Sequence, residues 1–136
     1  MKRLIIIMAL ALSVLLLVAC AGAESSAPEP VTLDFTGFDE FRFDPETATA
    51  KAGAQVTINF QNEGVLEHNW MLASNNIELT EAGEDDALGG AISGLVPGGG
   101  SKTFTFTAPP VGTYKILCTV PGHAAAGMVA EFKVTP

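Results

Sequence analysis

Short runs in which apolar and polar residues alternate constrain the fold of this chain more than any other feature. Val56, Ile58 and Phe60 alternate with polar residues, and Leu33 and Phe35 do the same. Comparable runs lie at residues 41–43, 68–72, 104–106, 114–118 and 128–134. Turn-forming residues separate these runs at 52–53, 62–64, 97–100 and 109–110. A period of two with frequent turns is typical of a sandwich or a barrel, so we predict an all-β domain.

Residues 75–94 break the alternating pattern. The segment is acidic and contains no run with a period of two. We expect a long surface excursion that holds one short helix.

The first residues have the composition of an export signal. Met1-Lys2-Arg3 is basic, Leu4–Val18 is apolar apart from Ser13, and the following Ala19-Cys20 ends a stretch that is similar to a bacterial lipobox. The apolar run is short for a spanning helix, which needs about 20 residues. We predict that residues 1–19 are a lipoprotein signal peptide and that Cys20 is lipidated. A plain signal peptide and an uncleaved anchor helix are the alternatives.

The residues after the signal have the composition of a linker. Residues 20–30 are small, polar and proline-containing, so we expect a flexible tether before a single domain at 31–136. Lipidation would hold this domain on the extracytoplasmic, periplasmic side of a bacterial membrane. Loss of residues 1–19 leaves 5 basic and 15 acidic residues, a formal charge of −10. Such a charge argues against nucleic acid as a partner and allows electrostatic steering towards a basic protein.

One loop and one distant histidine carry most of the metal-binding chemistry. Cys118, His123 and Met128 are spaced C-x4-H-x4-M between two strand-like runs, and the other histidine, His68, begins an earlier run. Alternation places Cys118 and Met128 at one rim of the core. If Cys20 carries a lipid, Cys118 has no intramolecular disulfide partner, and metal ligation would explain the thiol.

The ligand types in this set favour copper. Two imidazoles and a thiolate, with a long axial thioether, form a blue-copper electron-transfer site. Calcium and magnesium require oxygen ligands, which the loop lacks, and structural zinc is more usually held by cysteines or by cysteines with histidines.

Two segments resemble a known family. Residues 67–72 (Glu-His-Asn-Trp-Met-Leu) and 118–123 (Cys-Thr-Val-Pro-Gly-His) look like the matching segments of azurin, and residues 31–136 resemble the cupredoxins, which include plastocyanin and halocyanin. The x4/x4 spacing with Gly127-Met128 and the lipobox are most similar to the auracyanins, tethered blue copper proteins of green photosynthetic bacteria. The resemblance implies an eight-stranded Greek-key sandwich. It also implies one type 1 copper per chain, bound by His68, Cys118, His123 and Met128.

The resemblance also implies roles for neighbouring residues. Asn69 would bond to Thr119, and the backbone N–H groups of Asn69 and Val120 would donate to the Cys118 sulfur. Glu67 stands where azurin has a glycine whose carbonyl contacts copper, so that contact stays open. We expect an apolar electron-transfer patch beside His123, and its members are Val65, Leu66, Pro121, Ala124, Ala125 and Ala126.

These features predict a monomeric, membrane-tethered electron carrier rather than an enzyme. Its expected partners are redox proteins such as a quinol-oxidising membrane complex, cytochrome c or a photosynthetic reaction centre. A respiratory chain is equally compatible with the residues. The alternative function is a copper-binding or copper-delivery protein. Two histidines cannot supply the trinuclear centre of a multicopper oxidase, and a Cys-His nucleophile would require a Cys118 free of copper.

Lipid anchoring is tested by mass spectrometry of the mature protein. We expect its N-terminal residue to be Cys20 with a covalently attached lipid, because the lipobox directs both cleavage and acylation. A mature chain that begins at another residue, or that carries no lipid, would refute the tether.

Overall fold

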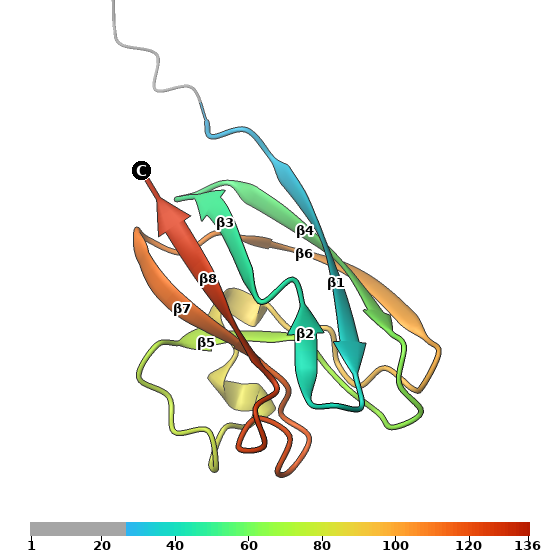
Figure 1. Cartoon of the computed structure of the whole chain (residues 1–136). Helices are drawn as coiled ribbons and strands as arrows, with labels where there is room; N and C mark the ends of the chain where they lie inside the picture. The colour runs from blue at the N-terminus through green and yellow to red at the C-terminus, as the bar shows by residue number, and fades with distance from the viewer. Residues whose placement is uncertain (1–26) are drawn as a thin grey trace, which may run out of the picture.

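In residues 27–136, eight strands form two four-stranded sheets that pack face to face (Figure 1). The computed structural model describes residues 27–136. The predicted signal peptide, the predicted lipid attachment at Cys20 and most of the predicted tether at 20–30 lie outside the described residues. The strands are β1 (Val31–Phe38), β2 (Arg42–Asp44), β3 (Thr47–Lys51), β4 (Gln55–Asn62), β5 (Met71–Ser74), β6 (Ser101–Thr107), β7 (Gly112–Leu117) and β8 (Val129–Thr135). One sheet has the order β2-β1-β4-β6 and the other β3-β8-β7-β5. The predicted all-β sandwich of about eight strands is confirmed.

The alternation in β4 shows how the sequence builds the core. Val56, Ile58 and Phe60 are buried, whereas Gln55 and Asn59 on the opposite face are exposed. Burying one such apolar side chain contributes roughly 1.5–3 kcal/mol. Residues from both sheets meet between the layers, where the ring of Trp70 lies 5.6 Å from that of Phe35.

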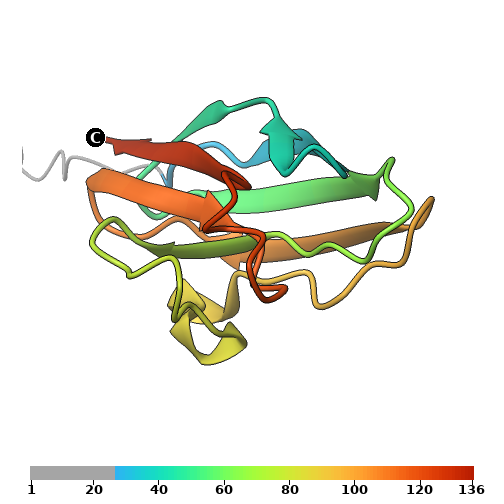
Figure 2. The ribbon, with the colours of Figure 1, turned by 60° about the horizontal axis from the view of Figure 1, so that its bottom comes forward.

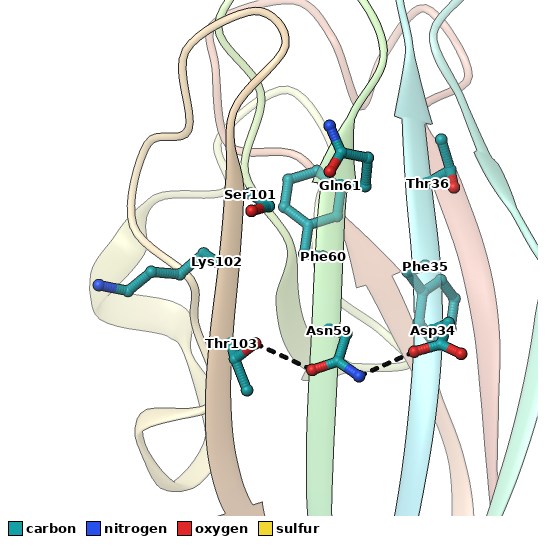
Figure 3. A pocket seen from close by; sticks show the side chains of 9 residues that line it. All are labelled: Asp34, Phe35, Thr36, Asn59, Phe60, Gln61, Ser101, Lys102 and Thr103. Atoms are coloured by element: carbon teal, nitrogen blue, oxygen red, sulfur yellow. Dashed lines mark hydrogen bonds between the residues drawn. The ribbon is translucent and has the colours of Figure 1, made fainter.

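The outer face of the β1–β4–β6 sheet carries polar residues joined across the strands. Asn59 in β4 donates to Asp34 in β1 at 2.8 Å and accepts from Thr103 in β6 at 2.9 Å (Figure 3). This polar face is exposed to solvent, while the opposite face of the sheet packs on the core, as the alternation of polar and apolar residues predicts.

The segment between β5 and β6 covers the part of the outer face of the other sheet that lies around β5 (Figure 2). It contains two single-turn 3₁₀ helices, η1 (Glu84–Asp86) and η2 (Leu88–Gly90), where we expected one short helix. Glycines at 83, 89 and 90 favour turns over a longer helix. Its apolar side chains Ile77 and Leu79 pack against Met71 and Leu117. Both faces of β5 are therefore buried.

Two strand boundaries differ from the predicted runs. His68 forms only an isolated bridge with Val96, and β5 begins three residues later at Met71. Phe41 lies in the turn before β2 with a φ of 55°, a left-handed conformation that is unusual for an aromatic residue. Tertiary contacts, described below, hold both residues at the candidate site.

The described residues include no helix that is long and apolar enough to cross a bilayer. The loop between β7 and β8 lies at the bottom of Figure 1, and the C terminus lies at the opposite end of the sandwich. β1 begins at the far end and runs towards the loop, so the described N-terminal residues are also remote from it.

Candidate metal centre

Three predicted ligand atoms converge at the end of the sandwich that holds the β7–β8 loop. The Nδ1 atoms of His68 and His123 are 3.1 Å apart. The Cys118 sulfur lies 3.5 Å from the His123 Nδ1 and 4.0 Å from the His68 Nδ1. Cys118 and His68 have no solvent exposure, and His123 keeps 9%.

These separations are close to those around a trigonal metal ion. With metal–nitrogen bonds of about 2.0 Å and metal–sulfur bonds of about 2.3 Å, evenly spaced ligand atoms stand about 3.5–3.7 Å apart. Of the three observed distances, 3.1 Å lies below that range, 3.5 Å lies within it and 4.0 Å lies above it. Only small shifts are needed for all three atoms to contact one ion.

Met128 is held beside these residues by the backbone. Its N–H donates to the His123 carbonyl at 3.0 Å, and its carbonyl accepts from the Cys118 N–H at 3.3 Å. The side chain is fully buried in the core cluster that also contains Cys118. The C-x4-H-x4-M loop thus folds back so that its two ends meet.

Asn69 joins the two ligand-bearing segments. Its side-chain amide donates to the Thr119 hydroxyl at 2.6 Å, and its side-chain oxygen accepts from the Thr119 N–H at 2.8 Å. The Asn69 backbone N–H donates to the Cys118 sulfur at 3.4 Å. Asn69 thus makes the contacts expected of it with Thr119 and the Cys118 sulfur. In metal sites, contacts of this kind orient a ligand and tune the metal.

Burial changes the protonation of both loop ligands. It raises the pKa of the Cys118 thiol, while the backbone N–H groups of Asn69 and Val120 act in the opposite direction. Burial, followed by the nearby His68, lowers the pKa of His123. A neutral imidazole is the form that binds metal, whereas the thiol must lose its proton when an ion binds.

Two residues at the site were missed by the sequence analysis, and both lie in the turn between β1 and β2. Asp39 contacts the Nε2 atom of His68 at 3.0 Å. The Phe41 ring packs against the His123 ring with centroids 4.9 Å apart. Asp39 is one of 15 acidic residues in the chain and stands in no motif, so the sequence holds no signal that singles it out.

The surface next to the proposed ligands exposes apolar residues, and these include all but one of the residues predicted for the electron-transfer patch. Val65 is 86% exposed and Leu66 45%. Pro121, Ala125 and Ala126 are also exposed. Ala124, expected in this patch, is buried and packs in the cluster under the 75–94 segment. Leu95, which is 55% exposed and lines a surface depression with Pro121, takes its place.

A profile of the copper-binding proteins of the plastocyanin/azurin family matches residues 31–135. This chain belongs to that family. The resemblance to the cupredoxins is confirmed, and copper is the cofactor that the family and the donor set of His68, Cys118, His123 and Met128 agree on.

Curated relatives narrow the similarity within the family. Auracyanin-A of Chloroflexus aurantiacus is 33% identical, and the alignment covers 89% of this chain and 90% of the relative. Auracyanin-B of the same organism is 30% identical, over 72% of this chain and 49% of the relative. The copper-resistant cuproprotein CopI of Rubrivivax gelatinosus is 31% identical, over 71% of this chain and 61% of the relative.

Solved structures give the same picture. Reduced auracyanin from the photosynthetic bacterium Roseiflexus castenholzii aligns with a TM-score of 0.69 at 28% identity, over 77% of this cupredoxin and 97% of the other chain. Auracyanin A of Chloroflexus aurantiacus, described as a blue copper protein, aligns with a TM-score of 0.65 at 32% identity, over 78% and 99%. An azurin from Methylomonas shares the fold, with a TM-score of 0.58 at 21% identity over 77% and 98%.

Proposed function

We propose that this cupredoxin is an electron carrier whose single type 1 copper is held by His68, Cys118, His123 and Met128. The convergence of two Nδ1 atoms and one thiol sulfur, at separations of 3.1, 3.5 and 4.0 Å, carries this proposal. When bound, copper supplies a one-electron couple between its cuprous and cupric states. The carrier needs no catalytic group, because the proposed activity is the transfer of single electrons and not the conversion of a substrate.

The protein holds its proposed ligand set through hydrogen bonds of its own backbone and side chains. Two antiparallel strand pairs and the Asn69–Thr119 hydrogen bonds fix Cys118 and His68, and backbone bonds within the loop fix His123 and Met128. A mixed set of imidazole, thiolate and thioether suits both oxidation states. Such a site need not rearrange when the charge changes, and this supports rapid transfer.

Electrons are proposed to enter and leave through His123 and the apolar patch around it. The patch is defined by residues Val65, Leu66, Leu95, Pro121, Ala125 and Ala126. His123 is the ligand with an exposed edge, and a small apolar surface suits weak, transient docking of redox proteins. The proposed partners are a quinol-oxidising membrane complex, cytochrome c or a photosynthetic reaction centre. The acidic charge of the domain favours basic faces on these partners.

A lipid on Cys20 is proposed to tether the carrier to the extracytoplasmic face of a bacterial membrane. β1 starts at Val31, soon after the proposed tether, and its eight residues lead towards the ligand end of the sandwich over roughly 23 Å. Attachment at the end where β1 starts, opposite the ligand end, leaves the proposed docking patch facing away from the membrane.

A copper-binding or copper-delivery function is the second candidate. It is favoured by the similarity to the copper-resistant cuproprotein CopI. A delivery protein would release one oxidation state readily, whereas a carrier retains copper through repeated cycles.

The proposed centre is tested by loading the purified protein with copper. We expect one copper per chain, an intense visible absorption from thiolate-to-copper charge transfer, and reversible bleaching on reduction without loss of metal. The Cys118→Ser variant should lack the band, whereas the Asn59→Ala control, altered on the distant outer face, should keep it. Colour that survives Cys118→Ser would contradict the proposal, and copper released on each reduction would favour the delivery function.

The axial role of Met128 is tested by the reduction potential. Met128→Leu should retain copper and raise the potential, because a donor that stabilises the cupric ion is lost. Met71→Leu changes a buried methionine that packs under the 75–94 segment, so it should leave the potential unchanged. Voltammetry measures both variants, and an equal or lower potential in Met128→Leu would exclude the axial assignment.

The patch is tested by electron self-exchange between oxidised and reduced copies, followed by NMR line broadening. Val65→Asp should slow exchange by about tenfold or more, because two like charges would meet when the patches dock. Val111→Asp is the control, since Val111 is 57% exposed in the β6–β7 connection at the far end of the sandwich. Equal slowing in both variants would indicate a net-charge effect and not a docking site.

A further inference from the structure

We propose that Asp39 is a positioning residue for the copper centre. Its carboxylate fixes the His68 ring with the Nδ1 lone pair towards the metal, and it joins that ring to the Val65–Leu66 part of the docking patch. The inference rests on the proposed copper site, but its first step concerns the metal-free protein.

The contact between Asp39 and His68 is direct. The Asp39 Oδ1 atom lies 3.0 Å from the His68 Nε2 atom, on the side of the ring opposite the Nδ1 that faces Cys118 and His123. The His68 side chain is fully buried and Asp39 keeps 30% exposure. The carboxylate therefore reaches inward from the surface to the outer edge of a buried imidazole.

The other bonds of the carboxylate determine where the proton lies. The Val65 N–H donates to Oδ2 at 2.8 Å and the Leu66 N–H donates to Oδ1 at 3.2 Å. Both oxygens thus act as acceptors, so the hydrogen shared with His68 belongs to Nε2. A neutral imidazole with its hydrogen on Nε2 presents a lone pair on Nδ1. This is the tautomer that a metal bound at Nδ1 requires.

The surrounding chain holds the carboxylate in this place. A Cβ atom added at Gly64 would overlap the Asp39 carboxylate. The Asn62 side-chain oxygen accepts from the Gly64 N–H at 2.9 Å, so the glycine is itself fixed. Asp39 cannot move towards Gly64 without displacing this backbone.

The β1–β2 turn that carries Asp39, together with the end of β1 that precedes it, lies against two other proposed ligands. The Phe41 ring packs on His123, and a Cβ atom added at Gly37 would come within 3.1 Å of the Met128 methyl group. The turn is closed by a hydrogen bond from the Phe41 N–H to the Phe38 carbonyl at 3.1 Å. Asp39 is the member of this turn that bonds to a ligand, and its neighbours position it.

The arrangement has two consequences. A carboxylate on the outer nitrogen raises the basicity of a ligating imidazole and favours the more positively charged metal state. The same carboxylate holds the Val65 and Leu66 backbone, so the docking surface and the ligand share one anchor. The exposed patch is thereby fixed relative to the copper.

The first experiment uses the metal-free protein and the ¹⁵N NMR signals of its two histidine rings. We expect His68 to carry its hydrogen on Nε2 as a single tautomer. In Asp39→Ala the Nε2–H of His68 loses its acceptor. A hydrogen on the Nδ1 atom of His68 could instead be donated to the Nδ1 atom of His123, so we expect the Nδ1–H tautomer of His68 to appear. Asp39→Asn keeps an oxygen that can accept from Nε2 and should retain the native tautomer.

The second experiment separates position from charge in the copper-loaded protein. Gly64→Ala keeps every charge but displaces the carboxylate, whereas Glu40→Gln removes a charge from the adjacent exposed residue. We expect Asp39→Ala and Gly64→Ala to weaken cupric binding by about 10–100-fold. Glu40→Gln should change it less than threefold, as should Gly83→Ala, where an added Cβ meets nothing within 4 Å. Asp39→Ala should also raise the reduction potential, by about 59 mV for each tenfold loss in cupric relative to cuprous affinity.

The outcomes are distinguishable. Native His68 with its hydrogen on Nδ1, or Asp39→Ala with native tautomer and affinity, would overturn the inference. An effect of Glu40→Gln as large as that of Asp39→Ala would assign the change to general charge and would also overturn it. A native protein that binds no copper would defeat the proposed function, while the ring signals of the metal-free protein would still decide the role of Asp39.

Discussion

The antiparallel register of β5 against β7 is the constraint on which the metal centre depends. Met71 pairs with Leu117, and two residues further along, Asn69 and Thr119 are joined by two hydrogen bonds of the Asn69 side chain. This register places His68 beside Cys118. A slip by one residue would exchange the two faces of the strand and separate the ligands. Both faces of β5 are buried, one by the core and the other by the 75–94 segment, so such a slip is strongly disfavoured.

Rigidity at this end of the sandwich connects the fold to electron transfer. Each proposed ligand is held by the backbone or by a neighbouring side chain: Cys118 by Asn69, His68 by Asp39, His123 by packing against Phe41, and Met128 by the loop that closes on itself. The proposed ligand atoms are therefore grouped by contacts of the protein itself. A carrier gains from this arrangement because a site that changes little between oxidation states has little to reorganise.

The two ends of the sandwich have different roles. The β7–β8 loop, which carries three of the proposed ligands, lies at one end, while the start of β1 and the C terminus lie at the other (Figure 1). Residues from distant parts of the chain form the patch: Val65 and Leu66 after β4, Leu95 before β6, and residues 121–126 between β7 and β8. Hydrogen bonds from Val65 and Leu66 to Asp39 connect part of this surface to His68, so the proposed docking surface and a proposed ligand share one structural unit.

The sequence by itself determined the sheet class, the positions of most strands other than β3, and the four proposed ligands. Alternation reports which side of a strand faces the core, and Cys, His and Met are scarce enough for their spacing to carry chemical meaning. The Asn69–Thr119 contact also followed, from family resemblance. Only the tertiary structure decided the place of Asp39 and Phe41, the burial of Ala124 and the cover over Met71, because each depends on segments far apart in the chain. In the sequence, Asp39 resembles any other acidic residue in a turn, and Ala124 resembles any other alanine in a loop. Only contacts with residues distant in the chain pair Asp39 with His68 and bury Ala124.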